Sequence, residues 1–169
     1  MSHFSKGNDY FARGEYAKAV LHYQSAIRLD PTQYNAYLNA GNAFYHLNDH
    51  EQAVEHFTQA IHLDGSCKTA YYNRASTYTR MEKFDLALAD YASVLHIDPN
   101  AVEAYLNRGS LYIKLNQPAL AVADFTQAIE REGIWQAYYN RAIAYEKLNQ
   151  PEQSQQDFIT ALRLKTESS

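Results

Sequence analysis

Two histidines four residues apart, His46 and His50, form the pattern in this sequence that comes nearest to a metal site. Histidines at i and i+4 on one helix can present two imidazoles to a single Zn²⁺ ion, and Asp49 between them would add a carboxylate. Asn48 favours a turn at this point, which places the two histidines on different helices. The sequence therefore favours solvated histidines over metal ligands, and we expect no metal or other cofactor.

Other chemical patterns are missing from the sequence. It contains no glycine-rich phosphate loop, no nucleophile elbow and no recognisable catalytic arrangement of Ser, Asp and His. Cys67 is the only cysteine, which excludes an internal disulfide and a thiol-based zinc cluster. The net charge is −4 and basic residues are scattered, so nucleic acid is not an expected partner. Without an apolar run of about 18 residues, membrane insertion is not expected either. We expect a non-enzymatic, cytoplasmic protein.

Asparagines that return at intervals of 34, 34 and 33 residues are the side chains best suited to recognition: Asn39, Asn73, Asn107 and Asn140. An amide carries both a donor and an acceptor, so a row of amides can pair with the backbone of an extended peptide. Each asparagine follows an apolar residue that could select peptide side chains. The predicted peptide- or protein-binding residues are Leu38, Asn39, Asn42, Tyr45, Tyr72, Asn73, Ser76, Arg80, Leu106, Asn107, Lys114, Tyr139 and Asn140.

A second interpretation of the same asparagines stays open at this point. Their amides can also bond locally between adjacent repeats, in which case they stabilise the fold. The two uses do not exclude each other.

The repeat that carries these residues has the length of two short helices and a turn. Apolar residues follow helical spacing on two faces, Tyr71, Ala75 and Tyr78 on one and Phe84 and Leu88 on the other. Residues that tolerate a left-handed backbone recur between the two helices, with Glu82 as the exception. The turn positions are Gly14, Asn48, Glu82, Asn116 and Asn149. The sequence thus predicts a helical hairpin in each repeat.

Two further regularities indicate how each hairpin is held together. Small residues such as Gly41 and Gly109 recur on first helices, and aromatic residues such as Phe57 and Phe125 recur on second helices, where the rings would fill the space that the small residues leave. Arginine and aspartate also recur together, and we expect them to form ion pairs within a repeat or across a junction. The pairs are Arg74 with Asp90, Arg108 with Asp124, and Arg141 with Asp157.

The run Tyr105-Leu106-Asn107-Arg108-Gly109, followed by Leu111-Tyr112 and then by Ala121, Phe125 and Ala128, resembles the tetratricopeptide repeat family, as does the closing pair Asp98-Pro99. The resemblance covers essentially the whole chain. It implies an all-α fold, an α-solenoid of five tetratricopeptide-type helical hairpins in a right-handed superhelical array. Partner proteins then usually bind the concave face lined by first helices, and no chemistry is implied. We expect a single array over residues 1–169, with repeats at about 1–33, 34–67, 68–101, 102–134 and 135–165 and a short tail at 166–169.

The resemblance also raises the subtype that clamps a C-terminal carboxylate with lysines, an arginine and asparagines. Phe4 and Thr69 stand where that subtype has lysines, and Asn73 stands where it has the arginine. A carboxylate clamp is therefore not expected. A row of basic residues places positive charge along one groove edge, where it could hold acidic side chains: Arg80, Lys114 and Lys147.

The last repeat leaves further alternatives open. Its second helix replaces apolar residues with glutamines, which suits an exposed end, but Ile159 and Leu162 remain apolar. A contiguous apolar patch commonly marks an interface. The alternative to an adaptor is therefore a structural module that forms a homodimer through the helix from Pro151 to Leu164. Another is the interaction part of a larger multidomain protein.

Overall fold

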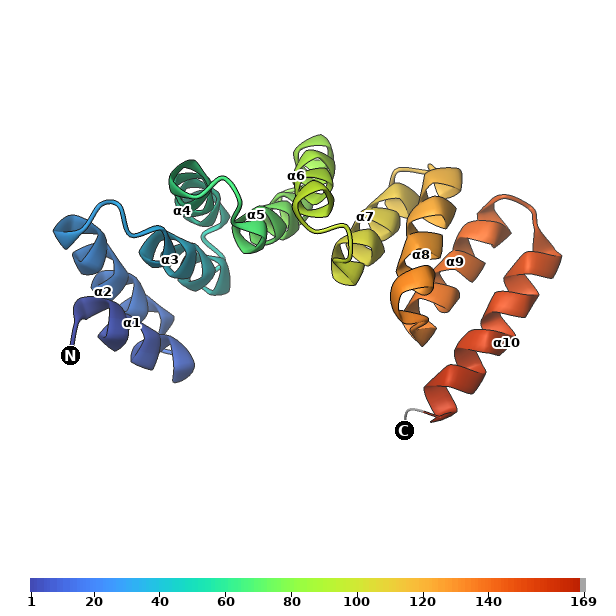
Figure 1. Ribbon diagram of the computed structural model, residues 1–169, viewed down its shortest axis with the longest axis horizontal. Helices are drawn as coiled ribbons and strands as arrows, with labels where there is room; N and C mark the ends of the chain where they lie inside the picture. The colour runs from blue at the N-terminus through green and yellow to red at the C-terminus, as the bar shows by residue number, and fades with distance from the viewer. Residues whose placement is uncertain (168–169) are drawn as a thin grey trace. The chain divides into compact units, whose positions relative to one another are not determined.

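The computed structural model describes residues 1–167 as ten α-helices, and no strand occurs within them. The helices are α1 (His3–Ala12), α2 (Tyr16–Leu29), α3 (Tyr34–His46), α4 (His50–Leu63), α5 (Lys68–Arg80), α6 (Phe84–Ile97), α7 (Val102–Lys114), α8 (Pro118–Glu132), α9 (Trp135–Lys147) and α10 (Pro151–Glu167). Consecutive helices pair into hairpins, each joined by a tight turn (Figure 1). The predicted all-α fold of five helical hairpins is confirmed.

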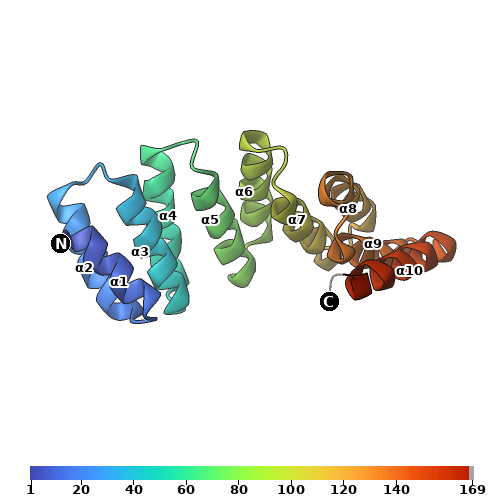
Figure 2. The same ribbon diagram turned by 60° about the horizontal axis from the view of Figure 1, so that its bottom comes forward.

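The chain divides into two compact units, Met1–Ile97 with α1 to α6 and Asp98–Ser169 with α7 to α10. Within the first unit α3 packs on α2 and α5 packs on α4, so that three hairpins stack side by side (Figure 2). Within the second unit α9 packs on α8 and joins two hairpins. None of the helices in residues 1–167 combines the length and apolar character needed to cross a membrane.

Every turn inside a hairpin uses one residue in the left-handed backbone region. The φ angles are 75° at Gly14, 60° at Asn48, 57° at Glu82, 56° at Asn116 and 55° at Asn149. Glycine and asparagine adopt this conformation at low cost, whereas a glutamate does so against its intrinsic preference. Glu82 differs in residue type from the other turn residues but adopts the same conformation, because the stacked hairpins impose the same turn on it.

Helix ends follow the local sequence. Pro118 and Pro151 are the first residues of α8 and α10, where a missing N–H has no intrahelical partner to lose. The sequence prediction began a tail at residue 166, whereas α10 continues to Glu167. The reason is that no glycine or proline follows Leu164, and Thr166 Oγ1 donates to the carbonyl of Arg163 at 2.7 Å. Residues 168–169 of that tail lie outside the described residues.

Close contact between a glycine and a ring holds three hairpins tightly. A Cβ added to Gly7, Gly41 or Gly109 would lie 2.6 to 2.7 Å from ring atoms of the second helix, which is far inside van der Waals contact. Phe57 and Phe125, two of these rings, are fully buried. The predicted complementarity of small and aromatic residues is confirmed in these hairpins.

The recurring arginines and aspartates form ion pairs between the two helices of one hairpin. Nε of Arg74 donates to Asp90 at 2.8 Å, and Nε of Arg141 donates to Asp157 at 2.7 Å. Each guanidinium makes a second, parallel hydrogen bond to the same carboxylate. The aspartate side chains are only 7% exposed, so these pairs are more buried than a surface ion pair.

Candidate functional site

The first unit contains a cavity of about 350 Å³ between its hairpins, which we call the α3/α5 pocket. Its walls come from α1, α3, α4 and α5. The lining residues are Phe11, Asn42, Tyr45, His46, Phe57, Tyr72, Asn73 and Ser76. Four aromatic rings, two amides, a serine and a histidine therefore surround one space. Such a lining offers both apolar contact and hydrogen bonds.

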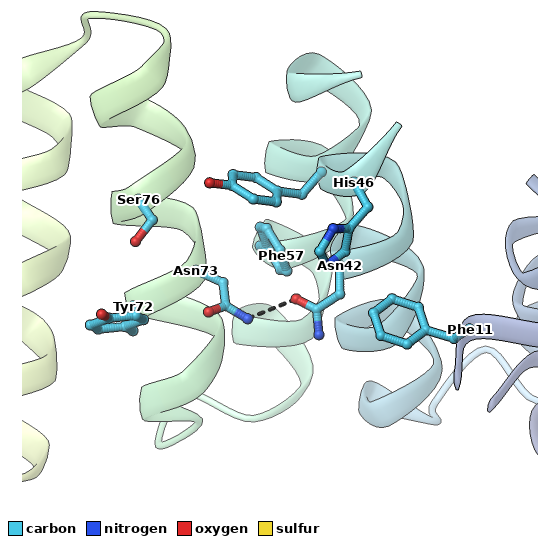
Figure 3. Close-up of a pocket in the computed structure, with 8 residues that line it drawn as sticks. Phe11, Asn42, His46, Phe57, Tyr72, Asn73 and Ser76 are labelled. Atoms are coloured by element: carbon cyan, nitrogen blue, oxygen red, sulfur yellow. Dashed lines mark hydrogen bonds between the residues drawn. The ribbon is translucent and has the colours of Figure 1, made fainter. Parts of the chain in front are cut away.

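Two asparagines meet across the junction between α3 and α5. Nδ2 of Asn73 donates to Oδ1 of Asn42 at 2.7 Å, and the two amides stand between Phe11 and Tyr72 (Figure 3). Asn42 Nδ2 and Asn73 Oδ1 have no partner among residues 1–167. The pair thus keeps one donor and one acceptor side by side at the pocket.

The same junction bond occurs one hairpin earlier. Nδ2 of Asn39 donates to Oδ1 of Asn8 at 3.0 Å, and the Tyr23 hydroxyl donates to the same oxygen at 2.9 Å. Burial raises the pKa of Tyr23 to about 12. Local bonding between hairpins, the interpretation that the sequence left open, is therefore present at Asn39 and Asn73. It does not use up the capacity of their amides.

Tyr45 and Arg80 form a second contact between α3 and α5. Nε of Arg80 donates to the Tyr45 hydroxyl, and the guanidinium carbon lies 5.3 Å from the Tyr45 ring centroid. The cation is thereby held beside a ring that lines the pocket. The bond to Tyr45 uses Nε, so the terminal nitrogens of the exposed Arg80 side chain are not part of it.

Tyr72 and Ser76 reach the pocket from α5 and are both fixed by Tyr91 of α6. The Tyr72 ring packs edge-on against the Tyr91 ring with centroids 5.9 Å apart, and Ser76 Oγ lies 3.3 Å from the Tyr91 hydroxyl oxygen. Burial raises the pKa of Tyr91 above its ordinary value. The wall at this side of the pocket is thus held by the hairpin core.

The structure brings five of the predicted binding residues to this pocket and places the others elsewhere. Leu38 packs against the hydrophobic core and does not line the pocket. Asn39 bonds to Asn8, and Arg80 contacts Tyr45 beside the pocket. The other predicted residues lie in the second unit, where Leu106 packs against the core cluster that contains Phe125. Tyr139 is 47% exposed and contacts Phe158, so it belongs to a separate hollow at the last hairpin. Asn107 and Asn140 are half-buried, and Lys114 is exposed at the end of α7.

Three lining residues were not among the predicted contacts: Phe11, His46 and Phe57. Phe11 occupies the repeat position of Tyr45, and the repeat spacing was the signal that could have added it. His46 stacks on Tyr16 with ring centroids 4.5 Å apart. Phe57 was predicted as a core residue. It is a core residue and also lines the pocket, because its ring is fully buried in the hairpin.

The histidine pair considered in the sequence is separated as expected. His46 ends α3 and His50 begins α4, with Asn48 in the left-handed turn between them. Over residues 1–167 no group of three or more His, Cys, Asp or Glu side chains is arranged to hold a metal ion. His46 and His50 instead pack against the Tyr45 ring.

Models of repeat families match nearly the whole chain. A TPR repeat model matches residues 7–48, and tetratricopeptide repeat models match residues 34–67, 75–137 and 136–167. None of the curated proteins matches the sequence.

Solved structures with the same architecture include MamA, with 20% identity, a TM-score of 0.91 and coverage of 96% of this chain and 95% of the MamA chain. YrrB is similar with 21% identity, a TM-score of 0.82 and coverage of 96% and 84%, and it is described as a TPR protein with an unusual peptide-binding site. A tetratricopeptide repeat protein from Parabacteroides merdae shares 26% identity, with a TM-score of 0.87 and coverage of 95% and 64%. These likenesses concern the fold.

Proposed function

Because the chain belongs to the tetratricopeptide repeat family, we propose that it is a non-catalytic adaptor that binds an extended peptide segment of a partner protein in the α3/α5 pocket. The observation that carries this proposal is the Asn42–Asn73 pair, which leaves one amide donor and one amide acceptor adjacent in an aromatic-lined cavity. An extended peptide offers a carbonyl and an N–H in the same alternation.

The rest of the lining supports the same proposal. Phe11 and Tyr72 stand on opposite sides of the amides and suit apolar peptide side chains (Figure 3). Arg80 at the edge suits an acidic side chain of the peptide. Apart from His46, the polar lining groups are amides and hydroxyls, which offer hydrogen bonds to a peptide. Asn107 and Asn140 of the second unit were also predicted to bind, and for them binding stays a prediction.

One substitution separates peptide binding from the structural role of the amides. Asn42→Asp keeps the oxygen that accepts from Asn73 and removes the Nδ2 donor. Peptides selected from a random display library on the full chain are measured against both proteins by fluorescence anisotropy. We expect at least a tenfold weaker Kd for Asn42→Asp, with an unchanged melting temperature.

The matched control is Asn8→Asp, which makes the same change on an asparagine that accepts the equivalent junction bond outside the pocket. It should leave the peptide Kd unchanged. Equal loss in both variants would mean that the added charge, not the pocket donor, weakens binding. The proposal would also fail if neither variant changed the Kd.

A second candidate function is self-association through α10. Ile159 and Leu162 lie one helical turn apart on this helix and are 57% and 66% exposed, and adjacent exposed aliphatic side chains favour an interface. Sedimentation equilibrium of the full chain tests it: a dimer that Leu162→Glu converts to a monomer supports this candidate, and a monomer at every concentration removes it.

A further inference from the structure

The outer face of the last hairpin has the form of the internal junctions but lacks their covering helix. α3 covers α2, α5 covers α4 and α9 covers α8. Leu162 occupies the repeat position of Ile27, Ile61 and Ile129, which are all half-buried, yet it is 66% exposed. Ile27, Ile61 and Ile129 lie on helices that a following helix packs against, whereas the helix of residues 1–167 that packs on α10 is α9.

Two adjoining hollows mark this face, and together we call them the terminal trough. One has a volume of about 650 Å³ and is lined at the turn by Glu146, Pro151 and Gln155. The other has a volume of about 430 Å³ and is lined by Trp135 and Lys165 near the other end of α10. Phe158 lines both hollows, so the trough is continuous along the hairpin.

Internal junctions show which kind of helix fits such a face. Ala43 of α3 belongs to one core cluster with Val20 and Tyr23 of α2. Ala144 of α9, at the same repeat position, clusters with Phe125 of α8. Alanine at this position lets the covering helix approach a ring closely. A helix in the terminal trough would meet Phe158 at the repeat position of Tyr23 and Phe125.

One position distinguishes the trough from the junctions with α5 and α9. Nη1 of Arg74 donates to Thr58 at 2.8 Å, and Nη1 of Arg141 donates to Thr126 at 3.0 Å, so both covering helices place an arginine on a threonine. In α10 the equivalent residue is Ile159, which offers no acceptor. An arginine on a helix that covers α10 would find no acceptor at Ile159, whereas an alanine in its place would gain apolar contact with Ile159.

Helix α3 shows the apolar form of this arrangement. It carries alanine in place of the arginine, and Ala36, Ala40 and Ala43 are all fully buried. These residues have the spacing i, i+4 and i+7 on a helix of 13 residues. α3 is therefore the internal template for a helix that would cover Ile159 and Phe158.

Charged residues at the two ends of the trough indicate which end charges a covering helix would carry. Glu146 lines the trough at the turn, and Lys165 lines it at the other end. A helix antiparallel to α10 would begin near Lys165 and end near Glu146. The internal first helices α3, α5 and α9 all end on a basic residue, which the acidic end of the trough would complement.

A second copy of this chain fits the trough poorly. Its α1, which a head-to-tail contact would supply, places Ser2, Lys6 and Asp9 at the repeat positions of the three buried alanines of α3. Burying Lys6 and Asp9 against apolar side chains would be unfavourable. The α10 of a second copy presents Ile159 and Leu162, which are not small.

We propose that the terminal trough binds, in trans, one amphipathic helix of a partner protein. That helix is about 13 residues long, like α3, has small apolar residues at i, i+4 and i+7, begins with an acidic residue and ends with a basic one. This interface is independent of the α3/α5 pocket.

The probe that tests this inference is a fluorescein-labelled peptide with the sequence of residues 33–48 and three changes. Asn35→Glu and His46→Lys supply the end charges, and Gly41→Ala raises helix propensity. Anisotropy with the full chain should show saturable binding. Leu162→Glu should weaken it at least tenfold, whereas Leu21→Glu, at an equally exposed leucine of α2, should leave it unchanged.

A compensating pair makes the test specific. The same peptide with Ala40→Arg should bind the natural chain at least tenfold more weakly, and Ile159→Thr in the chain should restore that loss by supplying the acceptor that Thr58 and Thr126 provide. Asn42→Asp in the full chain should leave binding of this helical probe unchanged, because Asn42 does not line the trough. Failure of the pocket proposal is therefore seen separately.

Three results would overturn the inference. They are absence of saturable binding, equal effects of Leu162→Glu and Leu21→Glu, and a chain that is dimeric until Leu162→Glu is introduced. The last result would mean that a second copy of the chain, and not a partner helix, occupies the trough. Circular dichroism of each variant should show an unchanged melting temperature, because the substituted leucines are about two-thirds exposed.

Discussion

Arg108 donates two parallel hydrogen bonds to the carboxylate of Asp124, from Nε to Oδ2 at 2.8 Å and from Nη2 to Oδ1 at 2.7 Å. The bonds to Asp124 raise the pKa of the Arg108 guanidinium above its ordinary value. The Asp124 side chain is 7% exposed, so its charge depends on this arginine rather than on water. Removing one partner leaves the other charge buried and uncompensated.

Charge reversal by Asp124→Lys should therefore lower the free energy of unfolding by about 3 to 5 kcal/mol, because two cations would meet in a buried site. Urea denaturation followed by circular dichroism measures the loss. The control is the double variant Arg108→Ala with Asp124→His, which copies the Ala40 and His56 of the second hairpin. It should recover most of the stability, and a double variant as unstable as Asp124→Lys would contradict the explanation.

Gly109→Leu should lower the free energy of unfolding by about 1 to 3 kcal/mol, because a side chain at this position would collide with the buried Phe125 ring. The first added atom, Cβ, would already lie 2.7 Å from that ring. Gly65→Leu is the matched control, since a Cβ there would meet only the Ile61 carbonyl at 3.9 Å. Thermal unfolding should separate the two variants clearly. Similar melting temperatures would show that the close approach is not limiting.

Glu82→Asn should raise the free energy of unfolding by about 1 kcal/mol, because asparagine tolerates a left-handed backbone better than glutamate does. Glu82 has a φ of 57°, which is close to the 56° of Asn116 in the equivalent turn. The reciprocal change Asn116→Glu should lower stability by a similar amount. Urea midpoints of both variants measure the effect, and two shifts of the same sign would contradict it.

Tyr23→Phe should make stability less sensitive to alkaline pH. The pKa of Tyr23 is raised from 10.0 to about 12 by burial, so the unfolded chain releases this proton at lower pH than the folded chain does. The stabilising difference is complete below pH 10 and is lost as the pH rises towards 12, by about 1.4 kcal/mol per pH unit. Urea midpoints at pH 9, 10 and 11 should therefore fall more steeply in the natural chain. Some slope should remain in Tyr23→Phe because the pKa of Tyr91 is also raised. Parallel curves for the two proteins would contradict the assignment.

The helical hairpins could be predicted from the sequence because their determinants are local. Helical spacing of apolar residues, turn residues such as Asn48 and Asn116, and prolines such as Pro118 each act within a few residues of their own position. Repetition then made pairwise regularities visible, among them the recurrence of Arg108 with Asp124. The last residue of α10 could not be predicted from the sequence, because helix boundaries depend on weak end effects.

The candidate site could be predicted only in part. The repeat spacing identified the row of asparagines, but it could not decide whether Asn73 bonds to a neighbouring hairpin or to a ligand. The structure shows the bond to Asn42 and also the atoms that this bond leaves over. That outcome depends on how closely two hairpins approach and on which rotamers fit between them.

The sequence by itself determined the repeat, the hairpin and the residue types at each position, because helix formation and turn conformation follow from short-range preferences. Only the tertiary structure decided which of those residues share a space. Asn42 and Asn73 lie with Phe11 and Tyr72 around one pocket. Tyr139 lies in the terminal trough instead, and Leu162 is exposed although its counterparts in earlier repeats are half-buried. The physical reason is that contacts between hairpins depend on the presence and distance of the next hairpin, which no single repeat encodes.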